Sequence, residues 1–323
     1  MNTPITLGTD ELGHSVTIDI ADAKHILVAG VAGSGKSSFL HNFITTYCPT
    51  DPDNARFMLI DTKQLELDRY HNLDHLITDV ISEPKKAILA LRWAAKEMDR
   101  RLALFLKLHI RSHEQYPVTD DDKFPRLICL VDGFAELMQQ FPKETAAVIE
   151  RILDLGAPVG IHLILTSTHG TVRALPASIL SRIPTLIVGK MGSKLESKHL
   201  LGQSGAETLH APDEVLYKTA VMKFPICVKT AHITDTEIET MMRKAKKSKI
   251  KAIIIDPTED DMESDDMFDV AREAVIESGK ASTSYLQRKL GIGYSRAARL
   301  LDILEAHGVI GPENGGKPRE VIK

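Results

Sequence analysis

Cysteine is scarce in this sequence, and long apolar runs are missing. The three cysteines, Cys48, Cys129 and Cys227, lie far apart and do not have the spacing of metal ligands. Their small number and wide separation favour a reducing compartment. Cys129 stands in an apolar run, so we expect it to be a small core residue. No apolar run approaches the roughly 20 residues that a membrane span requires, and the N-terminus lacks the basic-then-apolar pattern of a signal peptide. We therefore expect a soluble, cytoplasmic chain without a membrane segment.

An excess of positive charge is also missing. The sequence has 40 Lys and Arg residues against 44 Asp and Glu residues, a formal net charge of -4. Nucleic-acid binding would therefore depend on local basic patches and not on the overall charge. Apolar residues are abundant: 43% of the 323 residues are hydrophobic, enough for a sizeable core in one large α/β domain and a smaller one.

The strongest motif lies in residues 26–38. An apolar strand pattern is followed by Gly30, Gly35, Lys36 and Ser37 in the spacing G-x-x-x-x-G-K-[ST], and an apolar helix pattern comes next. Glycines let backbone N–H groups approach phosphate oxygens, and a helix N-terminus favours negative charge. Lys36 can reach the β- and γ-phosphates of ATP, and the Ser37 hydroxyl can ligate Mg²⁺. The alternative, a chance Gly-rich turn, is disfavoured by the flanking strand and helix. The predicted nucleotide-binding residues are Gly30, Val31, Ala32, Gly33, Ser34, Gly35, Lys36, Ser37 and Ser38.

Apolar runs and amphipathic stretches alternate between residues 26 and 188. The alternation of these runs and stretches predicts an α/β fold with a parallel, doubly wound sheet. A hairpin is expected within residues 6–20, before the first strand. Further strands are expected at 57–60, 127–132, 161–166 and 186–188, and helices at 84–105 and 145–155.

Polar residues follow three of these strands, where an open α/β sheet places its ligand crevice. Asp132 ends a buried strand about a hundred residues after the glycine loop, which is the Walker B pattern of a carboxylate that holds Mg²⁺ together with Ser37. Asp61 and Lys63 could border the same site, although a solvated loop is the commoner explanation. Thr168, in the segment after the strand 161–166, is the candidate γ-phosphate sensor.

The composition changes after residue 234. A basic block is followed by an acidic block without apolar periodicity, which predicts an exposed linker over residues 243–264. Helix patterns then occupy 268–277, 282–290 and 295–307, and two short β-like runs flank Asn314-Gly-Gly316. This pattern predicts a small winged-helix domain over residues 265–323, separate from a nucleotide-binding domain over residues 1–242.

The third of these helices presents Arg296 and Arg299 away from its apolar side. Such a helix can enter the major groove of DNA, where arginine pairs with guanine O6 and N7. The alternative is a protein-binding winged helix, because a fold does not dictate its ligand.

Together these residues resemble the motor and γ domains of the FtsK/SpoIIIE DNA translocases over nearly the whole chain. The motor resemblance rests on His25-Ile-Leu-Val-Ala-Gly30, Ile60-Asp-Thr-Lys63 and Gly160-Ile-His-Leu-Ile-Leu165. The γ resemblance rests on Lys280-Ala-Ser-Thr-Ser284 and Gly316-Lys-Pro-Arg-Glu320. It implies a RecA-like ATPase with Lys36, Asp132 and Thr168 as catalytic residues. It also implies a hexameric ring that pumps double-stranded DNA, and a γ domain that reads short G-rich sequences and contacts a site-specific recombinase. The DNA-binding residues that it implies are Arg288, Ser295, Arg296, Arg299, Lys317 and Arg319.

The sequence departs from the family pattern at positions that matter for hydrolysis. The family places a glutamate directly after the Walker B aspartate, where this chain has Gly133. Thr168 replaces the family's sensor glutamine, and Leu186 replaces an arginine of the family. We therefore expect ATP binding with slow hydrolysis, unless Glu136 or another carboxylate takes over. The resemblance begins at the motor's β subdomain, so neither the membrane N-terminus nor the α subdomain is expected in this sequence. In the γ domain, Ser295 stands where the family has an asparagine in its recognition helix.

Three functions are compatible with these features. The first is a DNA-dependent ATPase and translocase. The second is a DNA-binding protein that uses ATP as a switch without hydrolysing it, as the changed catalytic positions suggest. The third is a coupling ATPase for DNA transfer or secretion in a mobile element, and the γ-domain match favours chromosome-type DNA reading over it.

Overall fold

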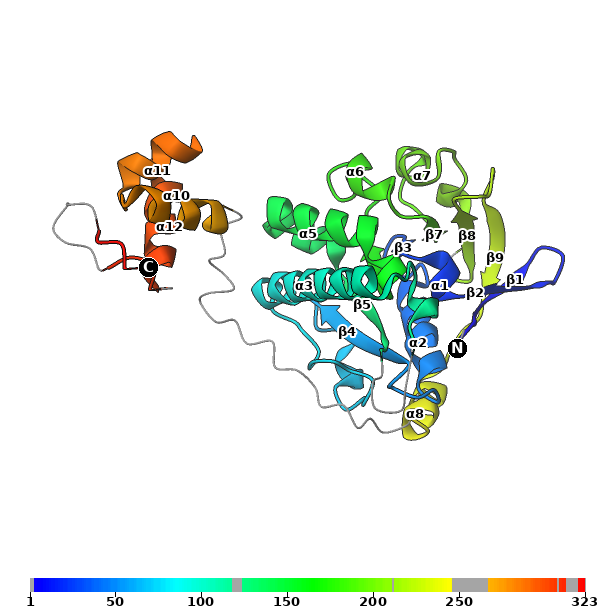
Figure 1. Cartoon of the computed structure of the whole chain (residues 1–323). Helices are drawn as coiled ribbons and strands as arrows, with labels where there is room; N and C mark the ends of the chain where they lie inside the picture. Colours follow the sequence, from blue (N-terminus) through cyan, green and yellow to red (C-terminus); the bar gives the residue numbers. More distant parts are fainter. Residues whose placement is uncertain are drawn as a thin grey trace. The chain divides into compact units, whose positions relative to one another are not determined.

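The structure is a computed structural model that describes residues 3–117, 124–210, 212–245, 267–306, 308–311 and 319–322. These residues belong to two compact units, one within Met1–Ile255 and one within Asp256–Lys323. Both are drawn in Figure 1. No helix in these described ranges is long and apolar enough to cross a membrane.

The first unit is built on a sheet whose nine described strands have the order β2-β1-β9-β8-β7-β3-β6-β5-β4. The five strands β7, β3, β6, β5 and β4 run parallel, so the predicted parallel, doubly wound core is confirmed. The other strands extend it in antiparallel fashion. The strands are β1 Ile5–Asp10, β2 Ser15–Ile18, β3 Ile26–Ala29, β4 Ala55–Asp61, β5 Arg126–Asp132, β6 Ile161–Ser167, β7 Thr185–Val188, β8 Glu214–Thr219 and β9 Ile226–Thr230.

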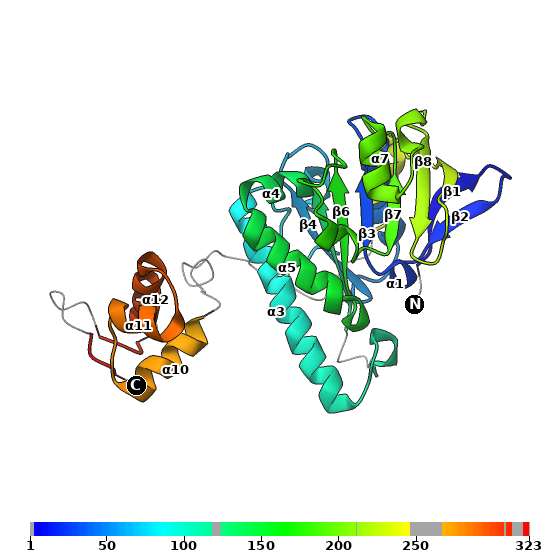
Figure 2. The same ribbon diagram turned by 90° about the horizontal axis from the view of Figure 1, so that it is seen from above.

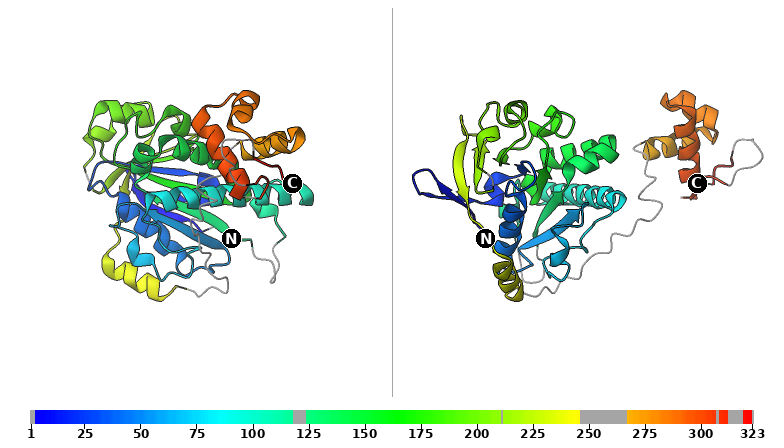
Figure 3. Two further views of the ribbon diagram at one scale, coloured as in Figure 1. Left: turned by 90° about the vertical axis from the view of Figure 1, so that its left-hand side faces the viewer. Right: turned by 180° about the vertical axis from the view of Figure 1, so that it is seen from behind.

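The antiparallel extension follows from short connections. Six residues separate β8 from β9 and four separate β1 from β2, and connections of this length can only join antiparallel neighbours. The β1/β2 pair confirms the hairpin predicted within residues 6–20. It projects beyond the body of the sheet (dark blue in Figure 3, right).

Helices cover both faces of the parallel strands, because successive side chains in a strand point to opposite faces. Met58 and Ile60 of β4 pack in one apolar core with α3, α4 and α5, whereas Phe57 and Leu59 pack in the other with α2. Figure 2 shows α3, α4 and α5 together along the parallel strands. Cys129 is fully buried in the first core, as predicted. The helices are α1 Ile20–Ala23, α2 Lys36–Tyr47, α3 Pro84–Leu108, α4 Phe134–Gln140, α5 Pro142–Leu155, α6 Ala177–Leu180, α7 Lys194–Leu201 and α8 Asp235–Arg243.

The second unit has helices α10 Phe268–Ser278, α11 Thr283–Leu290 and α12 Tyr294–Ala306. They match the three helices predicted from the sequence, and they enclose a separate apolar core that includes Leu286 and Leu300. An antiparallel bridge joins Ile310 to Val321, within the two predicted β-like runs, and a second antiparallel bridge joins Ala281 to Arg319. Residues 312–318, between these runs, lie outside the described residues, as do residues 246–264 of the predicted linker.

Candidate functional site

The glycine loop connects the buried strand β3 to α2 at the carboxyl end of the parallel strands. Gly35 caps α2 with φ +87°, and a Cβ at this position would lie 2.6 Å from the carbonyl oxygen of Pro212. Gly30 has a similar constraint, since a Cβ there would lie 2.2 Å from Ser34 Oγ. Only glycine fits at these two points. The loop therefore keeps its backbone N–H groups close to the space in front of α2, where a phosphate could bind.

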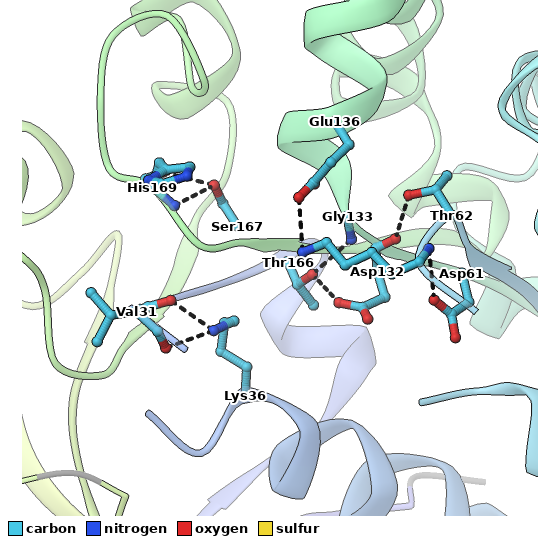
Figure 4. A network of polar contacts seen from close by, with 12 residues as sticks. Val31, Lys36, Asp61, Thr62, Asp132, Gly133, Glu136, Thr166, Ser167 and His169 are labelled. Atoms are coloured by element: carbon cyan, nitrogen blue, oxygen red, sulfur yellow. Dashed lines mark hydrogen bonds and ion pairs between the residues drawn. The ribbon is translucent and has the colours of Figure 1, made fainter. Parts of the chain in front are cut away.

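Lys36 is half-buried and folds back over the loop. Its Nζ donates to the carbonyl oxygens of Gly30, at 2.7 Å, and Val31, at 2.9 Å (Figure 4). Burial lowers the pKa of Lys36, and the nearby Asp132 carboxylate acts in the opposite direction. The ammonium group therefore lies between the loop and the end of β5, as a phosphate-binding lysine requires.

Asp132 ends β5 and is bound to the end of β6. Thr166 Oγ1 donates to Asp132 Oδ1 at 2.5 Å and accepts from the N–H of Gly133 at 3.1 Å. Burial raises the pKa of Asp132, whereas the hydrogen bond from Thr166 lowers it. The carboxylate is thus oriented by a neighbouring strand, and its oxygens are of the kind that Mg²⁺ prefers as ligands. Ser37 lies in the first turn of α2, directly after Lys36. No local pattern in the sequence indicates Thr166, because its contact with Asp132 depends on the register of β6 against β5.

Gly133 occupies the position that follows Asp132, at the start of α4. Its φ of +89° lies in the left-handed region, and a Cβ would stand 2.5 Å from Thr62 Oγ1 and 3.2 Å from Glu136 Oε2. A larger residue at 133 would therefore be strained and would displace Thr62. The surrounding side chains fill the space that a side chain at 133 would need.

The loop after β4 brings Lys63 to the same place. Asp61 holds this loop by accepting N–H bonds from Lys63, Leu65, Glu66 and Leu67. Its carboxylate is therefore used within its own loop, whereas Lys63 Nζ reaches across to Glu136 Oε1 at 2.8 Å. Glu136 and Lys63 come from segments far apart in the sequence, and no local pattern indicates that they pair.

The segment after β6 lies against the glycine loop. Gly30 donates its N–H to Ser167 O at 3.0 Å, and Thr168, half-buried, comes directly after this residue. Ser167 Oγ donates to His169 O at 2.7 Å, and the N–H of Gly170 donates to Glu196 Oε1 of α7 at 3.0 Å. Thr168 therefore belongs to a short turn that is fixed on both sides and follows the residue that accepts the N–H of Gly30.

The predicted DNA-binding residues of the second unit lie on three segments. Arg288 of α11 is exposed and donates to Ser284 O at 3.2 Å. Arg319 has a side chain only 11% exposed and donates to Asp302 Oδ1, at 2.7 Å, and to Glu305 Oε2. Its guanidinium group therefore holds the segment that begins at Arg319 against α12. Ser295, Arg296 and Arg299 lie in α12 with side chains that are outside the description, and Lys317 lies outside the described residues.

Two family profiles match this chain. The FtsK/SpoIIIE family matches residues 1–172, and the Ftsk gamma domain matches residues 262–323. The DNA translocase FtsK of Treponema pallidum (strain Nichols) is 35% identical over 341 residues, which cover 100% of this chain and 43% of that protein. The DNA translocase FtsK of Borreliella burgdorferi is 34% identical over 337 residues, which cover 99% of this chain and 43% of that protein. This chain thus spans less than half the length of these relatives.

Solved structures share the fold of the first unit. The cytoplasmic domain of the Thermomonospora curvata Type VII secretion ATPase EccC superposes with a TM-score of 0.67 at 22% identity, over 79% of this chain and 32% of that chain. The pCW3 conjugation coupling protein TcpA, solved with ATPγS, gives a TM-score of 0.65 at 18% identity, over 75% of this chain and 70% of that chain. At these identities the likeness concerns the fold, which is that of a P-loop ATPase.

Proposed function

We propose that this chain, which belongs to the FtsK/SpoIIIE family, binds Mg·ATP and uses its hydrolysis to translocate double-stranded DNA. The observation that supports this most directly is the placement of Lys36 and Asp132 close together at one edge of the parallel strands, beside a loop that tolerates only glycine at two positions (Figure 4). The match to relatives named DNA translocase FtsK supports DNA as the substrate.

Each group of this site has a separate task in the proposal. Lys36 leaves its two carbonyl partners and binds the β- and γ-phosphates, together with the N–H groups of the loop and of the first turn of α2. Ser37 and Asp132 hold Mg²⁺, which neutralises phosphate charge when it is bound. Thr166 orients Asp132 for this task, and Thr168 contacts the γ-phosphate.

The second unit reads DNA in this proposal. Helix α12, with Ser295, Arg296 and Arg299, enters the major groove, while Arg288 and Lys317 contact phosphates. Family resemblance adds a hexameric ring of such chains and contact with a site-specific recombinase. Arg319 acts on DNA indirectly, since its guanidinium group is bound to carboxylates of α12.

Two measurements test this function. Lys36→Ala should lose affinity for a fluorescent ATP analogue, because the charge that faces the β- and γ-phosphates is removed, and unchanged affinity would contradict the assignment of the site. The full chain should hydrolyse ATP faster with double-stranded DNA than without it. It should also displace a third strand from a DNA triplex in a reaction that requires ATP.

A second candidate is a DNA-binding protein that ATP switches without being hydrolysed. Gly133 favours this candidate, since it supplies no side chain where the family has a glutamate. The two candidates differ in turnover: ATP binding with turnover at background, with or without DNA, would support the second and exclude the first.

A further inference from the structure

A carboxylate occupies the space beside Gly133 although residue 133 itself carries none. Glu136 Oε2 lies 3.2 Å from the point where a Cβ of residue 133 would stand. The other oxygen, Oε1, pairs with Lys63 Nζ at 2.8 Å (Figure 4). The acidic group that the sequence lacks directly after Asp132 is thus present next to the same backbone position.

The path of the chain explains how Glu136 reaches this point. Gly133 turns the backbone sharply with φ +89°, and α4 begins at the next residue. The N–H of Glu136 donates to Gly133 O at 3.1 Å, so Glu136 lies in the first turn of this helix. Side chains of a helix lean toward its N-terminus, which here is the end of β5. Glu136 is therefore later in the sequence than the family glutamate but leans back over the same strand end.

The free oxygen of Glu136 requires a partner. Oε2 is buried and accepts no hydrogen bond within the described part of the chain. A buried carboxylate oxygen without a donor is unfavourable, so a water molecule or another donor is expected to satisfy it. The pKa of Lys36 is lowered mainly by burial. Among the nearby charges, Lys63 lowers this pKa and the carboxylate of Glu136 raises it. The carboxylate of Glu136 thus acts electrostatically on the phosphate-binding lysine.

The other carboxylates around this site are already in use. Asp61 accepts backbone N–H bonds from its own loop, including that of Leu67 at 2.9 Å. Glu66 pairs with His41 Nε2 at 3.3 Å, and Asp132 is the proposed metal ligand. Among the described carboxylates that act on Lys36, Glu136 therefore has one oxygen held by Lys63 and a second oxygen that accepts no hydrogen bond.

We propose that Glu136 is the catalytic carboxylate that orients and deprotonates the attacking water, and that Lys63 is its positioning residue. This inference rests on the proposed ATPase function. In the step, the water oxygen forms a bond to the γ-phosphorus while the bond from that phosphorus to the β–γ bridging oxygen breaks. The electron pair of the broken bond leaves with ADP, and the water proton passes to Glu136 and then to solvent. Hydrolysis is then not slow, in contrast to the expectation from Gly133 alone.

The first experiment compares matched carboxylate-to-amide changes in the full chain. Glu136→Gln should lower the DNA-stimulated kcat by ~10²-fold or more, the usual effect of losing a general base, and should leave ATP affinity within about threefold. Glu144→Gln, an exposed change in the neighbouring helix α5, should leave kcat unchanged. A kcat of Glu136→Gln within about threefold of the unchanged chain would overturn the proposal.

The second experiment tests Lys63 through a double-mutant cycle. Lys63→Met keeps the unbranched stem of the side chain and removes the charged ammonium group, so kcat should fall with little change in KM. In the Glu136→Gln background the same change should add almost no further loss, because a positioning residue acts through its partner. A rise in KM of equal size in both backgrounds would instead show that Lys63 contacts ATP directly, and would overturn its positioning role.

The failure of this inference is distinguishable from failure of the proposed function. If the unchanged chain shows DNA-stimulated turnover that Glu136→Gln retains, this inference fails while the proposed function stands. If the unchanged chain binds ATP with turnover at background, the translocase function and this inference both fail, and only nucleotide binding stands. If the unchanged chain does not bind ATP, the proposed function fails and this inference fails with it. Turnover that depends on Glu136 supports both.

Discussion

Thr166 Oγ1 donates to Asp132 Oδ1 over 2.5 Å and thereby joins the ends of two adjacent parallel strands. The same hydroxyl accepts the N–H of Gly133. One side chain thus fixes both the proposed metal ligand and the first residue of the turn that leads into α4.

Thr166→Val keeps the shape of this side chain and removes the hydroxyl. Asp132 and the N–H of Gly133 would each lose a buried partner, so we expect a loss of about 1–3 kcal/mol in the free energy of unfolding. The pKa of Asp132 should rise further, since the lost hydrogen bond lowers it, and ATP turnover should require more Mg²⁺. Denaturant unfolding and a Mg²⁺ titration measure the two effects. Thr166→Ser should preserve both, and a valine variant that behaves like the unchanged chain would refute the role of Thr166.

Gly133→Glu should not restore an ordinary family site. The left-handed φ and the contact with Thr62 Oγ1 should destabilise the chain by roughly 1–3 kcal/mol, and a second carboxylate beside Glu136 adds repulsion. Thr62→Ala in the same chain should recover part of the loss, because it removes the clash and leaves the backbone strain. Unfolding temperatures of the two single variants and the double variant measure this. A fully stable Gly133→Glu variant with higher turnover would show that our view of this turn is wrong.

Acid should destabilise the first unit through its buried histidines. Burial lowers the pKa of His25, His75 and His113 to about 4 each and that of His162 to about 3. In the unfolded chain these residues titrate near 6.5, so between pH 6.5 and 4 the unfolded state binds more protons than the folded state. Stability is therefore complete above about pH 6.5 and is lost as the pH falls toward 4.

Urea unfolding at pH 7, 6 and 5 measures this loss. His75→Phe should reduce the slope of stability against pH by up to about 1.4 kcal/mol per pH unit, the contribution of one proton. A slope that is the same with and without His75 would show that this residue does not contribute to acid sensitivity.

Arg319→Ala should destabilise the second unit by about 1 kcal/mol, because it removes the hydrogen bonds from a largely buried guanidinium group to Asp302, Glu305 and the carbonyl oxygen of Leu301. Arg288→Ala, an exposed change, should alter stability by less than about 0.5 kcal/mol. Amide hydrogen exchange of the second unit, measured in the full chain, compares them. Equal protection in the two variants would contradict the bracing role of Arg319.

DNA binding should separate base readout from phosphate contact. Arg296→Ala should cost about 1–3 kcal/mol on a G-rich duplex and little on other sequences, if it pairs with guanine. Lys317→Ala should weaken binding to all duplexes alike and reduce the salt dependence of affinity by about one phosphate contact. Titrations of both duplexes at several salt concentrations test this, and identical effects of the two variants on every duplex would exclude sequence reading.

The sequence by itself determined the local elements and the loop between them. The apolar run that forms β3, the glycine spacing and the helix pattern after Lys36 are local signals, and the structure has strand, loop and helix at these positions. The same holds for α10, α11 and α12, whose periodicity is visible within about a dozen residues. Side-chain periods of two and 3.6 residues are properties of the backbone alone, so neighbouring residues suffice to reveal them.

Only the tertiary structure decided which distant side chains meet. The contact of Thr166 with Asp132 joins residues 34 positions apart and depends on the register of β5 against β6. The pairing of Lys63 with Glu136 depends on a loop fixed by Asp61 and on the positive φ of Gly133. In the sequence Gly133 appears only as a missing carboxylate. The structure brings Glu136 beside it, because chain direction at a turn and strand register are set by packing across the whole sheet.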